Sequence, residues 1–156
     1  DEVVDAKGKY ILPGAIDPHT HISMPFMGTY AQDDYETGTI TEACGGVTCV
    51  VDFDLQQKGE TLLEALERKK ALAEGKVCVD YSLHPAVMDP RPDVIDEVKK
   101  ACLDYGTPSF KIFMVYDFRV DDATMIKLLE VTKQYGGLVQ VDAEKFYIIQ
   151  DITHNF

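Results

Sequence analysis

The sequence from residue 10 to residue 21 is Tyr10-Ile11-Leu12-Pro13-Gly14-Ala15-Ile16-Asp17-Pro18-His19-Thr20-His21. Its apolar first half predicts a buried strand over residues 10–16, with the two histidines at the carboxyl end of that strand. Because strand side chains alternate between faces, His19 and His21 are expected to point to the same side. Both imidazoles can therefore reach one metal ion, and neutral imidazole is a ligand that suits zinc.

A lysine lies inside a second apolar run, Phe110-Lys111-Ile112-Phe113-Met114-Val115. An unpaired ammonium group is costly to bury, so Lys111 needs a local explanation. Its side chain can extend to solvent at the strand end, or it can pair with a carboxylate such as Asp142. Alternatively, a desolvated lysine amine is a nucleophile that can take up carbon dioxide as a carbamate, which is able to bridge two metal ions.

Composition limits the classes of function. The chain has 156 residues, 46% of them hydrophobic, and a formal net charge of -12. An acidic surface repels nucleic acid and anionic membranes, so neither is expected as a partner. No apolar run approaches the ~20 residues of a membrane span, and the first residues lack a basic segment typical of a signal peptide. The four cysteines have no CxxC spacing and lie in apolar stretches, which favours buried free thiols in the cytoplasm.

Apolar runs alternate along the chain with amphipathic, capped helical patterns, which is typical of βαβ units and a parallel sheet. A complete (β/α)₈ barrel needs ~250 residues, so we expect an α/β fold that is a partial TIM barrel of about five βα units. Residues 11–156 are assigned to this barrel, and residues 1–10 resemble the end of a hairpin from a separate β-unit. The strands are predicted at 10–16, 47–53, 77–83, 109–115 and 138–142.

Several motifs together resemble the dihydropyrimidinase/D-hydantoinase branch of the amidohydrolase superfamily. They are residues 8–21, Pro25-Phe26-Met27-Gly28, 34–38, Gly45-Gly46-Val47-Thr48 with Asp52-Phe53, Asp80-Tyr81-Ser82-Leu83-His84 and 109–116. The resemblance covers nearly the whole chain. It implies an amidohydrolase-type barrel and a zinc-dependent, reversible hydrolysis of the ring amide of dihydropyrimidines or 5-substituted hydantoins, giving N-carbamoyl amino acids.

The resemblance also implies roles for single residues. His19 and His21 would bind one zinc ion, and carboxylated Lys111 would bridge it to a second. Tyr116 would donate a hydrogen bond to the substrate carbonyl and to the oxyanion that forms from it. Phe26 and Phe113 would surround the ring substituent. His84 is expected near the ligands without being one. Asp52 and Asp54 can orient ligands, although hydrogen bonds to nearby backbone explain them equally well.

One position departs from the family pattern. The fifth strand usually ends in His-Ala-Glu-Asn, with the histidine as a ligand of the second metal, but this chain has Asp142-Ala143-Glu144-Lys145. A carboxylate can bind zinc, although it is shorter than imidazole. With Asp142 in the ligand position we expect one zinc ion or none, instead of the two of the intact family enzyme. The aspartate that handles the proton in the family lies on a late barrel strand, beyond residue 156.

Three functions remain open from the sequence. The first is a cyclic amidohydrolase of the dihydropyrimidinase or hydantoinase type, of which this chain alone is a poor catalyst. The second is an allantoinase-like hydrolase, and the third is a non-catalytic relative that retains the fold as an assembly scaffold. The expected partners are a small cyclic amide and further copies of the chain, in a homo-oligomer that the resemblance makes a tetramer.

Overall fold

A computed structural model of the chain describes residues 2–26 and 28–155, with the backbone alone at Phe26. Its main feature is a parallel five-stranded sheet in the order β1-β4-β5-β6-β7, so that consecutive strands of the sheet are neighbours. A small antiparallel hairpin, β2 and β3, follows β1. The strands are β1 (Ala15–Thr20), β2 (Pro25–Phe26), β3 (Thr29–Tyr30), β4 (Val47–Leu55), β5 (Asp80–Ala86), β6 (Ser109–Phe113) and β7 (Leu138–Asp142).

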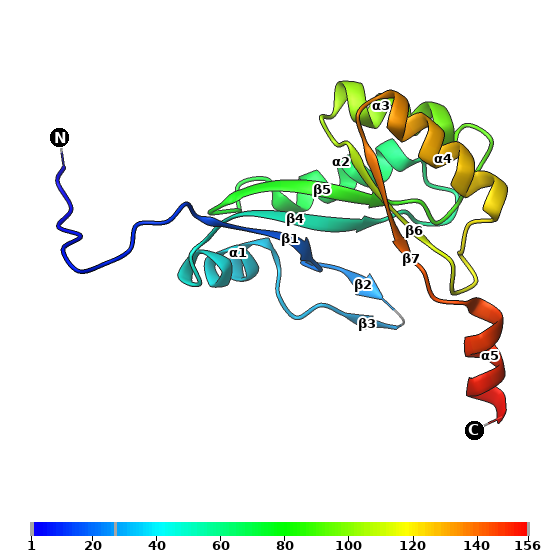
Figure 1. The fold of residues 1–156 in the computed structure, drawn as a ribbon, viewed down its shortest axis with the longest axis horizontal. Coiled ribbons are helices and arrows are strands. Elements are labelled where there is room, and N and C mark those ends of the chain that lie inside the picture. Colours follow the sequence, from blue (N-terminus) through cyan, green and yellow to red (C-terminus); the bar gives the residue numbers. More distant parts are fainter. Residues whose placement is uncertain (1, 27, 156) are drawn as a thin grey trace.

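Four helices connect the strands of the sheet and pack on it: α1 (Tyr35–Cys44), α2 (Leu62–Ala73), α3 (Val94–Asp104) and α4 (Asp122–Gln134). Helices α1 and α2 contact β4, α2 also contacts β5, α4 contacts β7, and α3 contacts both α2 and α4. The sheet curls from β1 to β7, with α2, α3 and α4 gathered on one side of it (Figure 1). The predicted partial TIM barrel of five βα units is confirmed.

The helices begin where the sequence predicts caps. The Thr61 hydroxyl accepts from the Glu64 backbone N–H at 3.0 Å, while the Glu64 carboxylate accepts from the Thr61 N–H at 2.8 Å. Asp34 caps α1 with the same reciprocal pair of bonds, and at the start of α4 the Asp121 carboxylate accepts from the Thr124 backbone N–H at 2.8 Å. The apolar faces of α2, α3 and α4 then bury a common core against the sheet, whose largest members include Leu62, Leu66, Val98, Phe110, Ile112 and Leu128.

The first strand begins later than predicted. Tyr10, Ile11 and Leu12 are 79–95% exposed and belong to no strand, whereas β1 begins at Ala15. Pairing with β4 starts at this point, because the Ala15 N–H donates to the Gly46 carbonyl at 3.0 Å. Just before it, a Cβ on Gly14 would overlap the Thr48 side chain, so the close approach requires glycine. The histidines nevertheless lie at the end of the strand, with His19 inside it and His21 directly after.

The third strand is also shifted, from the predicted 77–83 to Asp80–Ala86. Its register with β4 runs from Cys49↔Asp80 to Leu55↔Ala86, so the pairing begins only at Asp80. Val77 and Val79 pack instead against a second core cluster that contains Tyr35, Val50 and Ala73. Apolar character here reflects that packing and not membership of the sheet.

The cysteines are free, as predicted, but none of the four is fully buried, so the prediction of buried thiols is wrong. Cys44 and Cys78 are exposed, while Cys49 and Cys102 are half-buried. Cys44 is the last residue of α1, and Cys78 precedes β5, so both lie where elements end and apolar neighbours along the sequence do not cover them.

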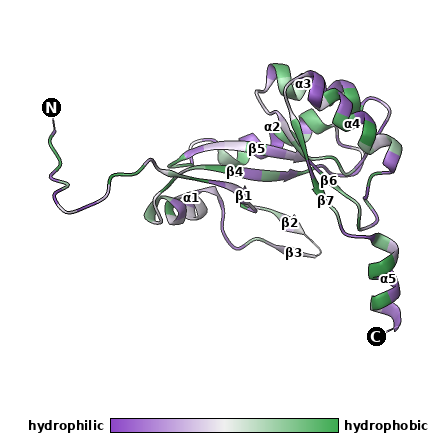
Figure 2. Ribbon diagram, viewed as in Figure 1, coloured by the Kyte–Doolittle hydropathy of each residue, from purple (hydrophilic) through white to green (hydrophobic). Residues whose placement is uncertain are grey.

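Both ends of the described chain lie apart from the sheet. Residues 2–14 form neither helix nor strand, and the assignment of residues 1–10 to a separate β-unit stays a prediction. Helix α5 (Phe146–Asn155) has no buried residue, although Figure 2 shows hydrophobic positions along it. Over residues 2–26 and 28–155, none of the helices has the length and apolar character that crossing a membrane requires.

Candidate functional site

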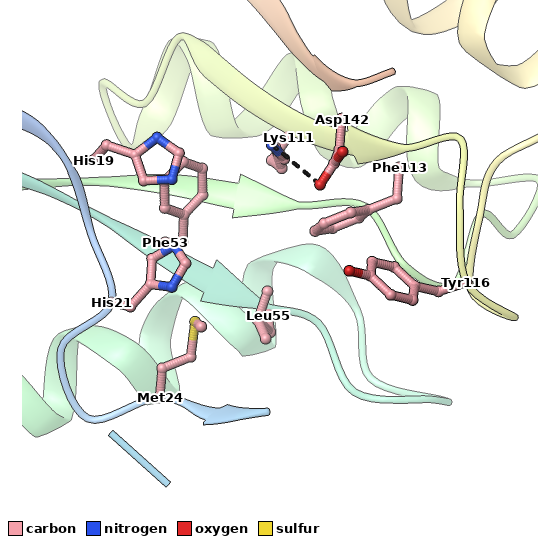
Figure 3. A pocket seen from close by; sticks show the side chains of 9 residues that line it. All are labelled: His19, His21, Met24, Phe53, Leu55, Lys111, Phe113, Tyr116 and Asp142. Atoms are coloured by element: carbon pink, nitrogen blue, oxygen red, sulfur yellow. Dashed lines mark ion pairs between the residues drawn. The ribbon is translucent and has the colours of Figure 1, made fainter. Parts of the chain in front are cut away.

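A cavity of about 210 Å³ opens at the carboxyl ends of the strands. In a parallel α/β barrel this is the end at which ligands bind, because the loops that follow the strands converge there. Figure 3 shows side chains from β1, β4, β6 and β7 around one space. The cavity is lined by His19, His21, Met24, Phe53, Leu55, Lys111, Phe113, Tyr116 and Asp142.

The two histidines point to the same side, as their alternation predicts (Figure 3). Their ring centroids are 5.3 Å apart and the rings are inclined by 29°. Phe53 from β4 contacts both, at 4.5 Å from the His19 ring and 5.4 Å from the His21 ring. This aromatic ring therefore forms an apolar wall beside both imidazoles.

The backbone that carries His19 is held from β5. Nε2 of His84 lies 3.0 Å from the carbonyl oxygen of Pro18, and its Nδ1 meets the hydroxyl of Ser109. A carbonyl oxygen can only accept, so Nε2 carries the hydrogen and Nδ1 accepts from Ser109. His84 is buried and does not line the cavity. It thus supports the His19 segment, which agrees with the expectation that it is not a ligand.

The residues on either side of His21 are held from β4. Oδ1 of Asp52 accepts from the Thr20 hydroxyl at 3.1 Å and from the Ile22 N–H at 2.9 Å. Oδ2 accepts from the Tyr35 hydroxyl at 2.8 Å and lies 2.9 Å from Nζ of Lys69. Asp52 therefore bonds to backbone, which is one of its two open roles, and through Thr20 and Ile22 it also holds the residues on either side of His21.

Lys111 and Asp142 face each other across β6 and β7. Nζ of Lys111 is 4.0 Å from Oδ2 of Asp142, and the two side chains are 14% and 30% exposed. The ammonium group also lies over the rings of Phe53 and Phe113, at 5.8 and 5.3 Å from their centroids. The ion pair considered from the sequence is therefore present, and it is long for a hydrogen-bonded contact.

Tyr116 turns its hydroxyl into the cavity from the loop after β6 (Figure 3). Its φ of 69° is unusual for a residue other than glycine, so the loop holds it in a conformation that costs energy. Burial, followed by the negative charges of Glu144 and Asp142, raises the pKa of the phenol above its ordinary value. Tyr116 therefore keeps its proton at neutral pH and is a hydrogen-bond donor.

Of the two predicted pocket phenylalanines, Phe113 lines the cavity, with its ring 6.0 Å from that of Tyr116. The side chain of Phe26 lies outside the described residues, so its predicted contact with a substituent stays a prediction. Met24 and Leu55 complete the apolar side of the cavity.

The imidazole of His21 is in a state that allows metal binding. Burial, and then the neighbouring His19, lower the pKa of His21 below its ordinary value. The ring is thus neutral at pH 7 and offers a lone pair, which a metal ligand requires. In type, three of the donors fit zinc, namely two imidazole nitrogens and the carboxylate of Asp142, whereas Lys111 fits only as a carbamate. In number they fall short, since residues 2–26 and 28–155 contain no group of three or more His, Cys, Asp or Glu side chains placed to hold an ion.

Sequence reasoning missed two residues that shape the site. In the sequence Phe53 is only one member of a motif, whereas its place on β4 puts it beside both histidines. Lys69 lies on α2 and is 2% exposed, with its ammonium group paired to Asp52. A signal for it existed, because position 69 follows Ala65 and Leu66 at helical spacing and thus falls on the inward face.

The chain is similar to known proteins over nearly its whole length. A model of the amidohydrolase family matches residues 10–156. The chain is 45% identical over 154 residues to the D-hydantoinase of Geobacillus stearothermophilus and 42% identical over 151 residues to the dihydropyrimidinase of Rattus norvegicus. These matches cover 97% and 96% of this chain but 33% and 29% of the relatives, so the chain spans about a third of their length.

Among solved structures, the dihydropyrimidinase from Brevibacillus agri NCHU1002 is similar with a TM-score of 0.93 and 43% identity, over 98% of this chain and 34% of that one. The fold and the sequence similarity indicate the same family. The chain belongs to the amidohydrolase family, and its resemblance to the dihydropyrimidinase and hydantoinase branch is confirmed.

Proposed function

We propose that this chain forms the first part of the active site of a cyclic amidohydrolase. The reaction is hydrolysis of the ring amide of a dihydropyrimidine or a 5-substituted hydantoin to an N-carbamoyl amino acid. The observation that carries the proposal is the convergence of His19, His21, Lys111 and Tyr116 on one cavity at the strand ends. The similarity to dihydropyrimidinases and D-hydantoinases supports the choice of substrate class.

We propose zinc as the metal, held by His19 and His21, with Lys111 as a carbamate and with Asp142 as a weaker oxygen ligand. Carbamate formation joins the neutral Lys111 amine to carbon dioxide and releases one proton. Starting from the ammonium form, two protons are released and a cation becomes a carboxylate-like anion. Bound zinc would lower the pKa of water and polarise the substrate carbonyl. With Asp142 at the ligand position we expect one zinc ion or none.

The residues of the chain itself supply orientation and charge stabilisation. The Tyr116 hydroxyl donates to the substrate carbonyl oxygen and follows it as negative charge develops, an interaction that strengthens in the transition state. Phe53 and Phe113 pack against the ring and its substituent and keep water from that side of the cavity.

The 156-residue chain by itself is proposed to be a poor catalyst. The sheet has free edges at β1 and β7, where Ile16 and Val141 are 65% and 37% exposed. The complete protein is proposed to be a cytoplasmic homo-oligomer, and the full activity belongs to it. An acid–base residue is expected outside these residues, and such a group is typically worth ~10²–10⁴ in rate.

An alternative is a scaffold protein that retains the fold without catalysis. The specific observation in its favour is the ion pair between Lys111 and Asp142, which neutralises both side chains without a metal. An allantoinase-like specificity is a second alternative within the enzyme class, since the strand-end residues do not separate it from the leading proposal.

The test is to purify the complete protein and measure its zinc content, then turnover of dihydrouracil, hydantoin and allantoin. A cyclic amidohydrolase binds zinc and opens the preferred ring. Raised bicarbonate should add a labile mass of one carbon dioxide at Lys111, and the Lys111→Ala variant should lose both this mass and activity. A folded, zinc-free protein without turnover would establish the scaffold instead.

A further inference from the structure

A buried ion pair lies directly behind the segment that carries His21. Lys69 projects from α2 and Asp52 from β4, and their side chains are 3% and 0% exposed. Neither residue lines the cavity at the strand ends. An ion pair withdrawn from water costs desolvation energy that its attraction repays only with good geometry and further hydrogen bonds. A contribution to stability therefore does not by itself explain why this ion pair lies behind His21.

The bonds of this pair end on the residues that flank His21. Asp52 accepts from the side chain of Thr20 and from the backbone N–H of Ile22. Lys69 donates to the backbone carbonyl of Ile22, so both polar groups of that residue's backbone are used by the same ion pair. His21 is thus fixed on its two sides while its own ring remains directed into the cavity.

The pair is itself locked by its surroundings. The Tyr35 hydroxyl donates to the second oxygen of Asp52 at 2.8 Å, and the Tyr35 side chain is fully buried. Lys69 Nζ also lies over the Tyr35 ring, 5.4 Å from its centroid. With these contacts, neither charged group can change its rotamer without leaving a buried charge unpaired.

We propose that Lys69 and Asp52 are positioning residues that fix the ring of His21 for metal binding. This inference rests on the proposed function for the identity of the metal, but not for the existence of the clamp. Loss of the Lys69 ammonium frees the Ile22 carbonyl and leaves Asp52 without its cation, so the segment over residues 20–22 becomes mobile. The affinity for zinc then falls, because partners that orient a metal ligand typically contribute ~10–100-fold to it.

The experiment compares Lys69→Met, Lys69→Arg and the double variant Lys69→Met/Asp52→Asn in the complete protein. Two quantities are measured: the dissociation constant for zinc, by competition with a chelator, and hydrogen exchange of the Ile22 amide. Lys69→Met should weaken zinc binding ~10–100-fold and accelerate exchange at Ile22. Lys69→Arg retains a cation and a donor, and it should recover most of the zinc affinity.

The double variant separates positioning from charge balance, because it removes both charges and so leaves no unpaired buried ion. It should regain stability but retain the weak zinc binding. Arg68→Met is the matched control, since Arg68 is the neighbouring residue on α2, pairs with Asp54 and Glu60, and has no bond to residues 20–22 among those the structure gives. It should leave zinc binding unchanged.

Two outcomes would overturn the inference. One is a folded Lys69→Met protein with zinc affinity and Ile22 exchange both within threefold of the parent. The other is full recovery of zinc affinity in the double variant. If the parent protein binds no zinc, the proposed function fails, while slow exchange at Ile22 that depends on Lys69 still establishes the clamp.

Discussion

The candidate site is built in two different ways on its two sides. On the β1 side, His19 and His21 sit on a segment that His84, Asp52 and Lys69 hold through buried hydrogen bonds. On the β7 side, Asp142 is 30% exposed and meets Lys111 at 4.0 Å. Both β1 and β7 are edge strands of the described sheet. The difference therefore comes from what supports each strand end, and not from its position in the sheet.

This contrast indicates which of the candidate ligands are already oriented for binding a metal ion. A metal site needs ligands whose orientation is fixed before the ion arrives, and that orientation comes from groups behind them. The histidine pair has such groups in β4, β5 and α2. On the β7 side, the helix that follows Asp142 in the chain is α5, which buries none of its side chains.

The largest expected effect is on zinc binding, when a candidate ligand is removed from either the β1 side or the β7 side of the site. His21→Ala should weaken zinc binding by more than ~100-fold, because a direct ligand contributes more than the partners that orient it. Asp142→Ala should change it by less than ~10-fold, since its carboxylate is less well held. Competition with a chelator measures both constants. Equal losses in the two variants would show that the β7 side is as well organised as the β1 side.

A second prediction concerns the buried carboxylate that follows Phe53 on β4. Burial raises the pKa of Asp54 to about 6, in spite of the nearby Arg68. An unfolded aspartate has a pKa of ~3.9, so the folded state binds this proton more tightly. The stabilising contribution of the protonated Asp54 is therefore fully present below about pH 4 and is lost as the pH rises to about 6. Above that pH, the free energy of unfolding no longer changes through Asp54.

At about 1.4 kcal/mol per pKa unit, the loss amounts to about 3 kcal/mol. The Asp54→Asn variant removes the titrating group, so its unfolding free energy should lack this fall. Urea unfolding between pH 4 and pH 8 measures the difference between the two proteins. If the parent and the variant have the same pH dependence over this range, Asp54 is ionised without cost in the folded state.

The sequence predicted the order of strands and most of the side chains that meet in the cavity. It could do so because strand alternation and helix caps are local, and parallel strands bring their carboxyl ends together. It failed where the outcome depends on what covers a segment. Tyr10 and Ile11 have the apolar character of residues in a buried strand, yet both are exposed. Val77 packs against a core cluster without joining the sheet.

The buried support of the histidines was the part hardest to predict. Asp52 was recognised with two roles open, and the choice between them depended on the backbone of Ile22, thirty residues away. Lys69 was passed over because a lysine on a helix is usually solvated. Its inward position was readable, but its partner was not, since the pairing joins α2 to β4 through the tertiary fold.

A third prediction concerns the β7 side of the site, where Asp142 can be replaced by a histidine. Asp142→His places an imidazole where the resemblance to the family implies a histidine ligand. In the complete protein, zinc content should rise from one equivalent or less toward two, and hydrolysis of the preferred cyclic amide should increase about tenfold, within the range of effects seen for metal-site partners. Two zinc equivalents in the parent protein would instead prove that Asp142 is an adequate ligand.

The smallest expected effect is the contribution of the Lys111–Asp142 pair to stability. The two charged atoms are 4.0 Å apart and the carboxylate is partly exposed, so solvent screens their attraction. A double-mutant cycle with Lys111→Met and Asp142→Ala should give a coupling below ~1 kcal/mol. The same cycle on Lys69 and Asp52, which are fully enclosed at 2.9 Å, should give a coupling several times larger. Equal couplings would mean that the β7 side is fixed as firmly as the β1 side. A weak Lys111 pair also leaves the amine available, because carbamate formation must first break its contact with Asp142.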